Sequence, residues 1–407
     1  MSLCCRFCQT PLKHSFVDLG MSPLSNAYVR DPGAEEIFYP LHARVCESCL
    51  LVQIPAFSAP EHIFKDYAYF SSFSTSWLAH AETYVQEIIP RLALTPDSHV
   101  VEIASNDGYL LQYFPENFQR LGIEPADNVA EVARQKGIPT RSLFFGTDTA
   151  GMLRSEGIQA DLIVANNVLA HVPDLNDFVK GLALLVAADG TITIEVPHLL
   201  HLYQQNQFDT IYHEHYSYFS LLALHQIFQA HQLTIYDVEA LSTHGGSLRL
   251  FITPESNGDQ EIHERVEATL QQEKALGLDQ LDTYLDFAER IKNLKLNTWQ
   301  FFLELQGKKK SIAAYGAPAK GNTFLNYCGI KPEMLPFCVD KNPHKQGLFL
   351  PGSRIPIHPP EKLYEDKPDY ILILPWNLTS EITAQLKDCR DWGAQFVTAI
   401  PELRVLP

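Results

Sequence analysis

The sequence predicts an α/β protein with two doubly wound, Rossmann-like sheets and a small cysteine-rich module at the N-terminus. Two observations predict this class. Short apolar runs typical of buried strands alternate with stretches of helical composition, first in the middle of the chain and again near its end. The chain also has 407 residues, too many for one ordinary core, so two or three domains are expected.

Composition and charge narrow the class of protein. Hydrophobic residues make up 46% and charged residues 19% of the chain, as in an ordinary soluble protein. No apolar run is long enough to span a bilayer, and the start MSLCCRFC has no secretory signal pattern, so we expect a cytoplasmic protein without membrane partners. The net charge of −17 argues against nucleic acid as a partner, and it requires a dedicated local site for any anionic substrate. The expected assembly is a monomer or a weak homo-oligomer.

Residues 1–65 form the predicted N-terminal module. Prolines interrupt its short apolar runs, which indicates a loop-rich segment with too little apolar material for a core of its own. Five of the eight cysteines lie in its first 49 residues, and four of them repeat one spacing, Cys5 with Cys8 and Cys46 with Cys49, which Cys4 does not share. Two residues between thiolates let one turn present both sulfurs to zinc, and two such turns complete a tetrahedral shell. With no position open for water, this zinc would be structural.

Strand and helix patterns predict the remaining elements in order. Residues 66–256 form the central unit, residues 257–308 a helical connector, and residues 309–407 the C-terminal unit. The connector lacks proline and should hold two or three helices. The central unit should have a helix at 77–92, strands at 100–104, 121–124, 162–165 and 191–195, and helical stretches at 110–114, 128–136 and 175–187. Strands of the C-terminal unit are expected at 311–316, 336–339, 370–374 and 395–399.

The first strand of the central unit leads into a turn, residues 102–108, that suits a nucleoside cofactor. An acidic residue followed by small residues lets a cofactor approach the backbone at the carboxyl edge of the sheet. Only Gly108 remains where a dinucleotide fingerprint has three glycines, which disfavours NAD. Glu124 ends the second strand, where a carboxylate can accept hydrogen bonds from both ribose hydroxyls. Together these positions predict S-adenosylmethionine. The candidate cofactor residues at the strand ends are Glu102, Ala104, Asn106, Gly108, Glu124, Asn166 and Asn167.

A run of histidines and aromatic residues, 211–218, follows the fourth strand and predicts proton transfer. Histidine titrates near neutral pH, and a neighbouring glutamate or tyrosine can set its tautomer and its basicity. Two alternatives are a second zinc site at His213 and His215, for which no third ligand lies nearby, and a cluster of core aromatics. His171, just after the third strand, is a further candidate for the same chemistry.

The C-terminal unit opens with a strand and a glycine-containing turn, residues 315–321. Such a turn offers backbone N–H groups and the positive end of a helix to a phosphate, and Lys320 adds a charge. Pro318 replaces the middle glycine of a dinucleotide fingerprint, so the phosphate of a nucleotide-linked substrate is favoured over NAD, with a plain strand-to-helix turn as the alternative. The turn at His244 should also line a pocket. The candidate substrate residues are His244, Tyr315, Gly316, Lys320, Asn322 and Trp376.

In this order, the motifs resemble those of the nucleotide-sugar C-methyltransferases that add the branching methyl group at C3 of deoxysugars. The resemblance covers essentially the whole chain, from the two cysteine pairs to the Trp376-Asn377 pair. It implies a zinc-binding module, a central S-adenosylmethionine domain, a C-terminal Rossmann-like domain that helps to hold the nucleotide, and a TDP-linked 4-keto-deoxysugar as substrate. Ala104 stands where a glycine is common in the family, and it should be tolerated if the backbone angle there is ordinary.

The resemblance also implies the catalytic residues. His215 matches the base of the family, supported by Glu214 and Tyr212. The C4 ketone acidifies the hydrogen on C3, His215 removes that proton, and Tyr212 or His171 donates to the enolate oxygen. A tyrosine before the serine pair at 71–72 matches another active-site position. The implied residues are His171, Tyr212, Glu214, His215 and either Tyr69, which we favour, or Tyr67, with Ser71 in the cofactor site.

Three other classes compete with this interpretation. A sugar-nucleotide oxidoreductase or epimerase would place NAD at the C-terminal loop. A non-catalytic zinc-bearing binding protein would have no need to keep the cluster at 212–215. An RNA methyltransferase with a zinc knuckle is disfavoured by the net charge of −17.

Overall fold

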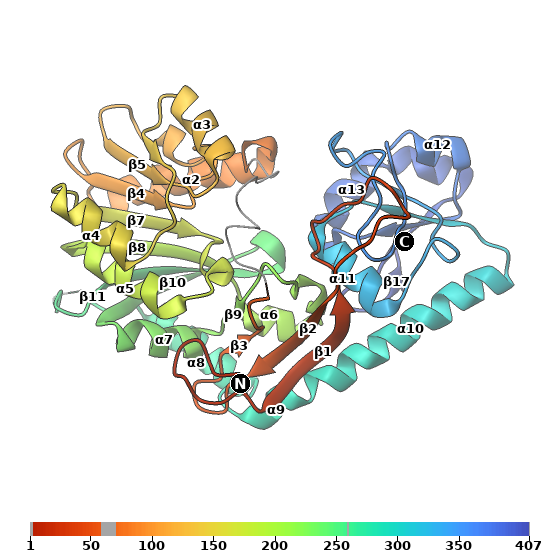
Figure 1. Cartoon of the computed structure of the whole chain (residues 1–407), viewed down its shortest axis with the longest axis horizontal. Coiled ribbons are helices and arrows are strands. Elements are labelled where there is room, and N and C mark those ends of the chain that lie inside the picture. The colour runs from red at the N-terminus through yellow and green to blue at the C-terminus, as the bar shows by residue number, and fades with distance from the viewer. Residues whose placement is uncertain (1–2, 58–70, 259, 407) are drawn as a thin grey trace.

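The computed structural model describes residues 3–57, 71–258 and 260–406. The central and C-terminal sheets lie in two separate lobes (Figure 1). Strands β1 (His14–Ser22) and β2 (Tyr39–Val45) lie at the base of the picture between the lobes, and the long helix α10 (Phe287–Gly307) runs beneath the C-terminal lobe. None of the described helices is long and apolar enough to cross a membrane.

The N-terminal module contains a sheet rather than the loop-rich segment expected from the sequence. β1 and β2 pair antiparallel, and β3 (Val52–Gln53) and β9 (Ser217–Tyr218) extend the sheet in that order. The rings of Phe16 on β1 and Phe287 on α10 stack with their centroids 4.4 Å apart. The module therefore shares a core with segments distant in the chain, which its own composition does not reveal.

The central sheet is doubly wound, as predicted, with seven strands in the order β10-β11-β8-β7-β4-β5-β6. Neighbouring strands from β4 to β8 are parallel, and their side chains enter two separate cores, so both faces carry helices. The parallel strands are β4 (His99–Ile103), β5 (Gln119–Ile123), β6 (Thr140–Arg141), β7 (Ala160–Asn166) and β8 (Val186–Pro197). Helices α2 (Thr75–Arg91) and α3 (Asp127–Gln135) cover one face; α4 (Thr147–Ser155), α5 (Leu175–Leu185) and α7 (Leu221–Ala230) cover the other.

Two parts of the central unit differ from the prediction. Residues 110–114 form only a short 3-10 turn, η2 (Leu111–Tyr113), instead of a longer helix. The antiparallel strands β10 (Leu233–Leu241) and β11 (Ser247–Pro254) were not predicted, and they close the sheet beside β8. The four predicted strands themselves correspond to β4, β5, β7 and β8.

The connector has three helices, α8 (Glu264–Ala275), α9 (Leu281–Leu285) and α10, in agreement with the prediction. The C-terminal sheet has the order β14-β13-β12-β15-β16-β17. In both large sheets the chain continues on opposite sides of one strand, β4 or β12, and such a switch point creates a crevice at the carboxyl ends of the strands. The C-terminal elements are β12 (Ile312–Tyr315), α11 (Ala319–Cys328), β13 (Cys338–Val339), β14 (Ile357–His358), α12 (Lys362–Asp366), β15 (Tyr370–Ile373), α13 (Thr379–Gln385), β16 (Gln395–Thr398) and β17 (Arg404–Val405).

Candidate active site and metal centre

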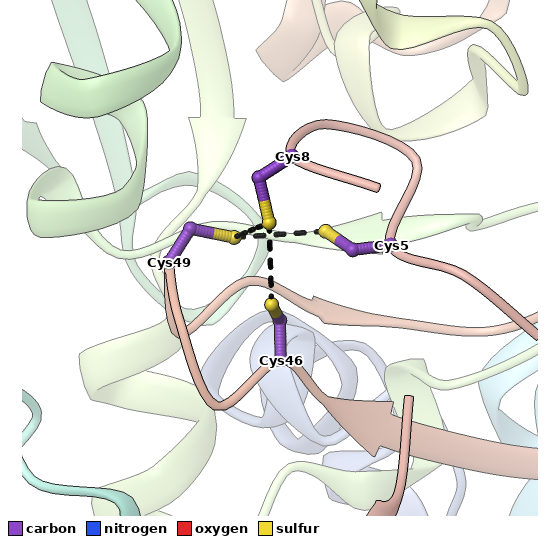
Figure 2. A group of neighbouring side chains, drawn as sticks. All are labelled: Cys5, Cys8, Cys46 and Cys49. Atoms are coloured by element: carbon purple, nitrogen blue, oxygen red, sulfur yellow. Dashed lines mark hydrogen bonds between the residues drawn. The ribbon is translucent and has the colours of Figure 1, made fainter. Parts of the chain in front are cut away.

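Four cysteine sulfurs converge between two loops of the N-terminal module (Figure 2). The sulfurs of Cys5, Cys8, Cys46 and Cys49 all lie within 4.8 Å of one another, and three of the pairs are 3.4, 3.6 and 3.7 Å apart. A tetrahedral zinc ion with Zn–S bonds of about 2.3 Å needs sulfurs about 3.8 Å apart, so the four residues fit this metal. Hydrogen bonds with the neighbouring thiols lower the pKa of Cys5 to about 3 and raise that of Cys49.

The first cysteine turn is anchored to the segment that carries the histidine cluster. The guanidinium of Arg6 donates to the backbone carbonyls of Pro173, at 2.7 Å, and Ile54, at 2.5 Å. It also lies 5.4 Å from the ring centroid of Tyr216. Burial lowers the pKa of Arg6 to about 10, so the group stays charged at neutral pH. The zinc centre therefore supports Tyr216, the residue that follows His215.

The turn after β4 brings three of the predicted cofactor residues together. Glu124 accepts the backbone N–H groups of Asn106 and Ala126, each at 2.9 Å. The side-chain oxygen of Asn106 accepts the N–H of Ser71 at 2.9 Å. Burial raises the pKa of Glu124, and it lifts that of Glu102 well above its ordinary value. Ser71, Asn106 and Glu124 thus form one connected group at the carboxyl ends of β4 and β5.

The backbone of this turn is left-handed at three positions. φ is +56° at Ala104, +50° at Asn106 and +76° at Gly108. Glycine and asparagine adopt this region readily, whereas for alanine it costs about 1–2 kcal/mol. Ala104 was expected to be tolerated if its backbone angle were ordinary. The angle is left-handed instead, so the residue is held in a strained conformation.

Asn166 and Asn167 end β7 at the same edge of the sheet. The N–H of Asn167 donates to the carbonyl of Glu195 at 2.8 Å, and its Nδ2 lies 3.4 Å from Nε2 of His244. Its Oδ1 is buried without a hydrogen-bond partner among the described residues. A buried acceptor of this kind fits a donor group of a ligand. Together with the carboxylate of Glu124, it matches the amino and hydroxyl groups of S-adenosylmethionine.

His215 is held in one tautomer by its hydrogen bonds. Its Nδ1–H donates to the carbonyl of Thr210 at 2.9 Å, so Nε2 carries the lone pair and accepts the O–H of Tyr212 at 2.8 Å. Burial, with a smaller effect of His171, lowers the pKa of His215 well below its ordinary value. The ring of His171 stands edge-on with its centroid 4.7 Å away, and burial lowers its pKa to about 4. At neutral pH both rings are neutral, and His215 is available as a base.

The other two members of the 212–215 run have different partners. Glu214 is buried, and both its carboxylate oxygens lie 2.9 Å from Nδ2 of Asn26, so its partner belongs to the N-terminal module. His213 donates from Nε2 to the carbonyl of Pro40 at 3.2 Å. His213 and His215 therefore do not share a site. Across the described ranges, the cysteine group is the only cluster with metal-ligand geometry, and the alternative of a second zinc site finds no support.

Two backbone N–H groups of the turn at 315–321 are bonded within the C-terminal domain. The N–H of Gly316 donates to the carbonyl of Val339 at 2.7 Å, and the N–H of Ala317 donates to the carboxylate of Asp340 at 2.7 Å. Pro318 has no N–H. The N–H groups of Gly316 and Ala317 are therefore not available to a phosphate, and the predicted phosphate site depends on the first N–H groups of α11 and on Lys320.

Two of the predicted substrate residues make contacts that hold the fold. The hydroxyl of Tyr315 donates to the side chain of Gln385 at 3.3 Å, and burial raises its pKa to about 12. Asn322 donates from Nδ2 to the carbonyl of Ser25 at 2.6 Å. Tyr315 therefore packs within the C-terminal domain, and the hydrogen bond of Asn322 connects α11 to the N-terminal module.

Lys320, Trp376 and His244 come together between the central and C-terminal domains. Nζ of Lys320 donates to Oδ1 of Asn377 at 2.9 Å and lies 4.5 Å from the ring centroid of Trp376. A side chain at Gly245 would meet the ring of Trp376 at 2.4 Å, so the turn beside His244 requires glycine. Burial and then the charge of Lys320 lower the pKa of His244 to about 4.

Asp209 and Thr210, in η4 (Phe208–Thr210), belong to the same site but were not predicted. Oδ2 of Asp209 accepts the indole N–H of Trp376 at 2.7 Å, while the carbonyl of Thr210 holds His215. Burial raises the pKa of Asp209 to about 6. The signal that could have identified Asp209 in the sequence is an acidic residue just before the aromatic run at 211–218. The tyrosine candidates at 67 and 69 lie outside the described residues.

Comparison with known proteins finds relatives over the whole chain. Three family models match: "Putative zinc binding domain" over residues 5–64, "Methyltransferase domain" over residues 77–238 and "C-methyltransferase C-terminal domain" over residues 242–401. The chain is 35% identical over 405 residues to "C-methyltransferase NovU" of Streptomyces niveus, covering 99% of this chain and 96% of that protein. Solved structures with some likeness include an SAM-dependent methyltransferase from Anabaena variabilis, with 17% identity, a TM-score of 0.36 and coverage of 44% of this chain and 86% of that one. Another is magnesium protoporphyrin IX methyltransferase from Synechocystis, with 15% identity, a TM-score of 0.33 and coverage of 48% and 88%.

Proposed function

Because the chain belongs to the C-methyltransferase family, as an S-adenosylmethionine-dependent enzyme with a zinc-binding module, we propose that it methylates C3 of a TDP-linked 4-keto-deoxysugar. The product would be a branched deoxysugar. Membership of this family argues against the three competing interpretations, which were an NAD-dependent oxidoreductase, a non-catalytic binding protein and an RNA methyltransferase. The choice of a keto-sugar and of its C3 position rests on the motifs described above and on the chemistry of the site.

The arrangement of His215 is the observation that carries the proposal. Carbon is a poor nucleophile until a neighbouring carbonyl makes its hydrogen acidic and a base removes that hydrogen. The Thr210 carbonyl fixes the proton of His215 on Nδ1, so Nε2 presents a lone pair beside Tyr212 and His171. A transferase that methylates a hydroxyl group has less need of such a base.

In the proposed reaction, Nε2 of His215 takes the proton from C3, next to the C4 ketone. The pair of electrons from the C–H bond forms a C3–C4 double bond, and the carbonyl pair moves onto oxygen. The O–H of Tyr212 occupies the lone pair of Nε2 in this structure, so that hydrogen bond has to shift to the C4 carbonyl oxygen before Nε2 can take the C3 proton. His171 is the other candidate donor to this oxygen. Glu124 and Asn167 would hold S-adenosylmethionine, which would supply an electrophilic methyl group on its sulfonium.

Hydrogen exchange at C3 tests the base separately from methyl transfer. The enzyme is incubated in D2O with a TDP-4-keto-deoxysugar and S-adenosylhomocysteine, and loss of the C3 proton signal is followed by NMR. We expect His215→Asn to bind S-adenosylhomocysteine normally but to exchange at least about 100-fold more slowly. His225→Asn, at an exposed position on α7, is the matched control. Near-normal exchange in His215→Asn would contradict the proposal.

The pH dependence of the exchange supplies a second readout. Because burial lowers the pKa of His215 well below 6.5, the base is unprotonated throughout the neutral range. The value of kcat/KM for exchange should therefore stay constant as the pH falls to 6.5 and should decrease only at more acidic pH. A midpoint at 6.5 or above would identify another group as the base.

A further inference from the structure

The ammonium group of Lys320 is directed away from the turn that was expected to hold a phosphate. Lys320 lies in the first turn of α11, but its Nζ contacts the side chains of Asn377 and Trp376, which begin the next crossover of the sheet. Within the turn, the carboxylate of Asp340 accepts the N–H of Ala317. Lys320 presents its ammonium group next to Trp376.

Asp209 places a negative charge next to the indole N–H of Trp376. It is only 1% exposed, and its Oδ2 accepts the indole N–H at 2.7 Å. The next residue, Thr210, holds the Nδ1–H of His215 through its carbonyl. One short element, η4, thus fixes both the residue that balances Lys320 and the tautomer of the base.

The charge of Lys320 reaches the titratable groups that surround it. After burial, it is the main cause of the lowered pKa of His244, and it opposes the rise in the pKa of Asp209. Its contribution to the lowered pKa of His215 is smaller than those of His171 and His244. Burial lowers the pKa of Lys320 itself, which Asp209 opposes. Among the described residues Lys320 forms no direct ion pair, because its nearest contacts are the neutral Asn377 and Trp376. An ammonium group whose direct partners are neutral favours a further anion.

We propose that Lys320 is a catalytic residue whose ammonium group stabilises the enolate oxygen formed when His215 removes the C3 proton. Asp209 and Trp376 are positioning residues: Asp209 holds the indole of Trp376, whose ring centroid lies 4.5 Å from the ammonium nitrogen, and the next residue, Thr210, holds the base. The inference rests on the proposed function and deepens it, since it requires a substrate in which a ketone lies next to the carbon that loses its proton.

The step is balanced without another reactant. The C3–H bond breaks, and the proton goes to Nε2 of His215. The electron pair forms the C3–C4 double bond, and the π pair of the carbonyl becomes a lone pair on its oxygen. Lys320 keeps its protons and meets the new charge through N–H···O hydrogen bonds. A preorganised donor in a site shielded from water contributes on the order of 10²- to 10³-fold to the rate.

The C3 exchange assay with S-adenosylhomocysteine tests this role. We expect Lys320→Met to lower kcat for exchange by about 10²- to 10³-fold, while the Kd for TDP, measured by calorimetry, stays close to that of the wild type. Lys345→Met is the matched control: it removes another partly buried ammonium group of the same domain, one that donates to the Ala317 carbonyl at 2.8 Å, and it should keep near-normal exchange. Lys320→Arg, which retains the charge, should recover part of the lost rate.

Two results would overturn the inference. An unchanged kcat in folded Lys320→Met, or in Lys320→Gln if the methionine variant folds poorly, would show that the charge does not act on the enolate. A large rise in the Kd for TDP with an unchanged kcat would assign Lys320 to the pyrophosphate. Failure of the proposed function would be distinguished by a different result, since the wild-type enzyme itself would then exchange no C3 hydrogen.

Asp209→Asn tests the positioning role through the pH profile. The groups that face Lys320 are Asp209, His215 and His244, and both histidines are neutral at alkaline pH. Removing the carboxylate therefore lowers the pKa of Lys320 further, so the ammonium loses its proton at lower pH. The alkaline decrease in kcat/KM for exchange should move to lower pH than in the wild type. A uniform loss of rate with an unchanged alkaline limb would overturn this role.

Discussion

Ala104 occupies a left-handed position, with φ at +56°, in the turn that leads from β4 to the cofactor group. Its N–H donates to the carbonyl of Ile123 at 2.7 Å, so the neighbouring strand β5 fixes the conformation. The strands at the two ends of the turn determine the backbone path, so residue 104 adopts the left-handed angle although its side chain disfavours it. The cost is local, since Asn106 and Gly108 adopt their left-handed angles readily.

Ala104→Gly should therefore raise the free energy of unfolding by up to about 1 kcal/mol. Glycine relieves a backbone strain of about 1–2 kcal/mol in the folded state. This gain is partly offset, because glycine gives the unfolded chain more conformational freedom and so stabilises the unfolded state by about 0.4–1 kcal/mol. Urea unfolding measures the difference. Ala268→Gly, at an exposed position within helix α8 (Glu264–Ala275), is the control and should lose about 1 kcal/mol. An equal loss in both variants would show that the turn carries no strain.

At the scale of single residues, the sequence predicted partners that are close in the chain. The structure joins Tyr212 and His215, three positions apart, by a hydrogen bond of 2.8 Å. Glu214 meets Asn26 instead, 188 positions away, and no local pattern identifies such a partner. The left-handed angle at Ala104 was also beyond prediction, because it is imposed by strand pairing rather than by the residue itself.

At the scale of elements, helix α8 of the connector supports the start of α7 through one buried carboxylate. Glu273 accepts the N–H groups of Leu221 and Leu222, at 2.6 and 2.8 Å, in the first turn of α7. It also lies 2.6 Å from Nε2 of His198, and its side chain is fully buried. A carboxylate at this end of a helix satisfies unpaired donors and interacts favourably with the helix dipole.

Glu273→Gln should lower the free energy of unfolding by about 1–3 kcal/mol. A carboxylate offers acceptors on both oxygens, whereas a glutamine turns an N–H2 group towards one of the three donors and leaves it unpaired in the interior. Thermal and urea unfolding measure the loss. Glu267→Gln, at an exposed position on the same helix, should change stability by less than about 0.5 kcal/mol. Equal stability of the two variants would contradict this account.

The predicted strands were those with short, mainly apolar runs. Strands β4, β5, β7 and β8 are buried between two helical layers, so their sequences read as short apolar runs. The hairpin β10–β11 was missed because it carries buried charges that interrupt the pattern. Asp237 pairs with Arg265, and Arg249 pairs with Glu195 at 2.7 Å, and both Asp237 and Arg249 are at most 5% exposed. Such pairs are found only when the folded neighbours are known.

At the scale of the whole molecule, the N-terminal module joins the two larger domains. Asn26 contacts Glu214 in the central domain, and the hydroxyl of Tyr28 donates to the carbonyl of Ala317 in the C-terminal domain at 2.5 Å. The three-part organisation was predicted from the sequence. These contacts were not, because they connect segments of low apolar content across nearly the full length of the chain. The candidate site lies where these parts meet.

Zinc removal should therefore affect the active site as well as stability. Without the metal the cysteine loops lose their link, and Arg6 no longer holds Tyr216 beside His215. Cys8→Ser should lose stoichiometric zinc, lower the Tm by about 5 °C or more, and slow C3 exchange more than it weakens S-adenosylhomocysteine binding. Cys4→Ser, outside the sulfur cluster, is the control for all three measurements. Strong chelation of the wild type should reproduce the Cys8→Ser result. A Cys8→Ser protein with full zinc content and wild-type exchange would show that the cluster neither holds the metal nor supports the base.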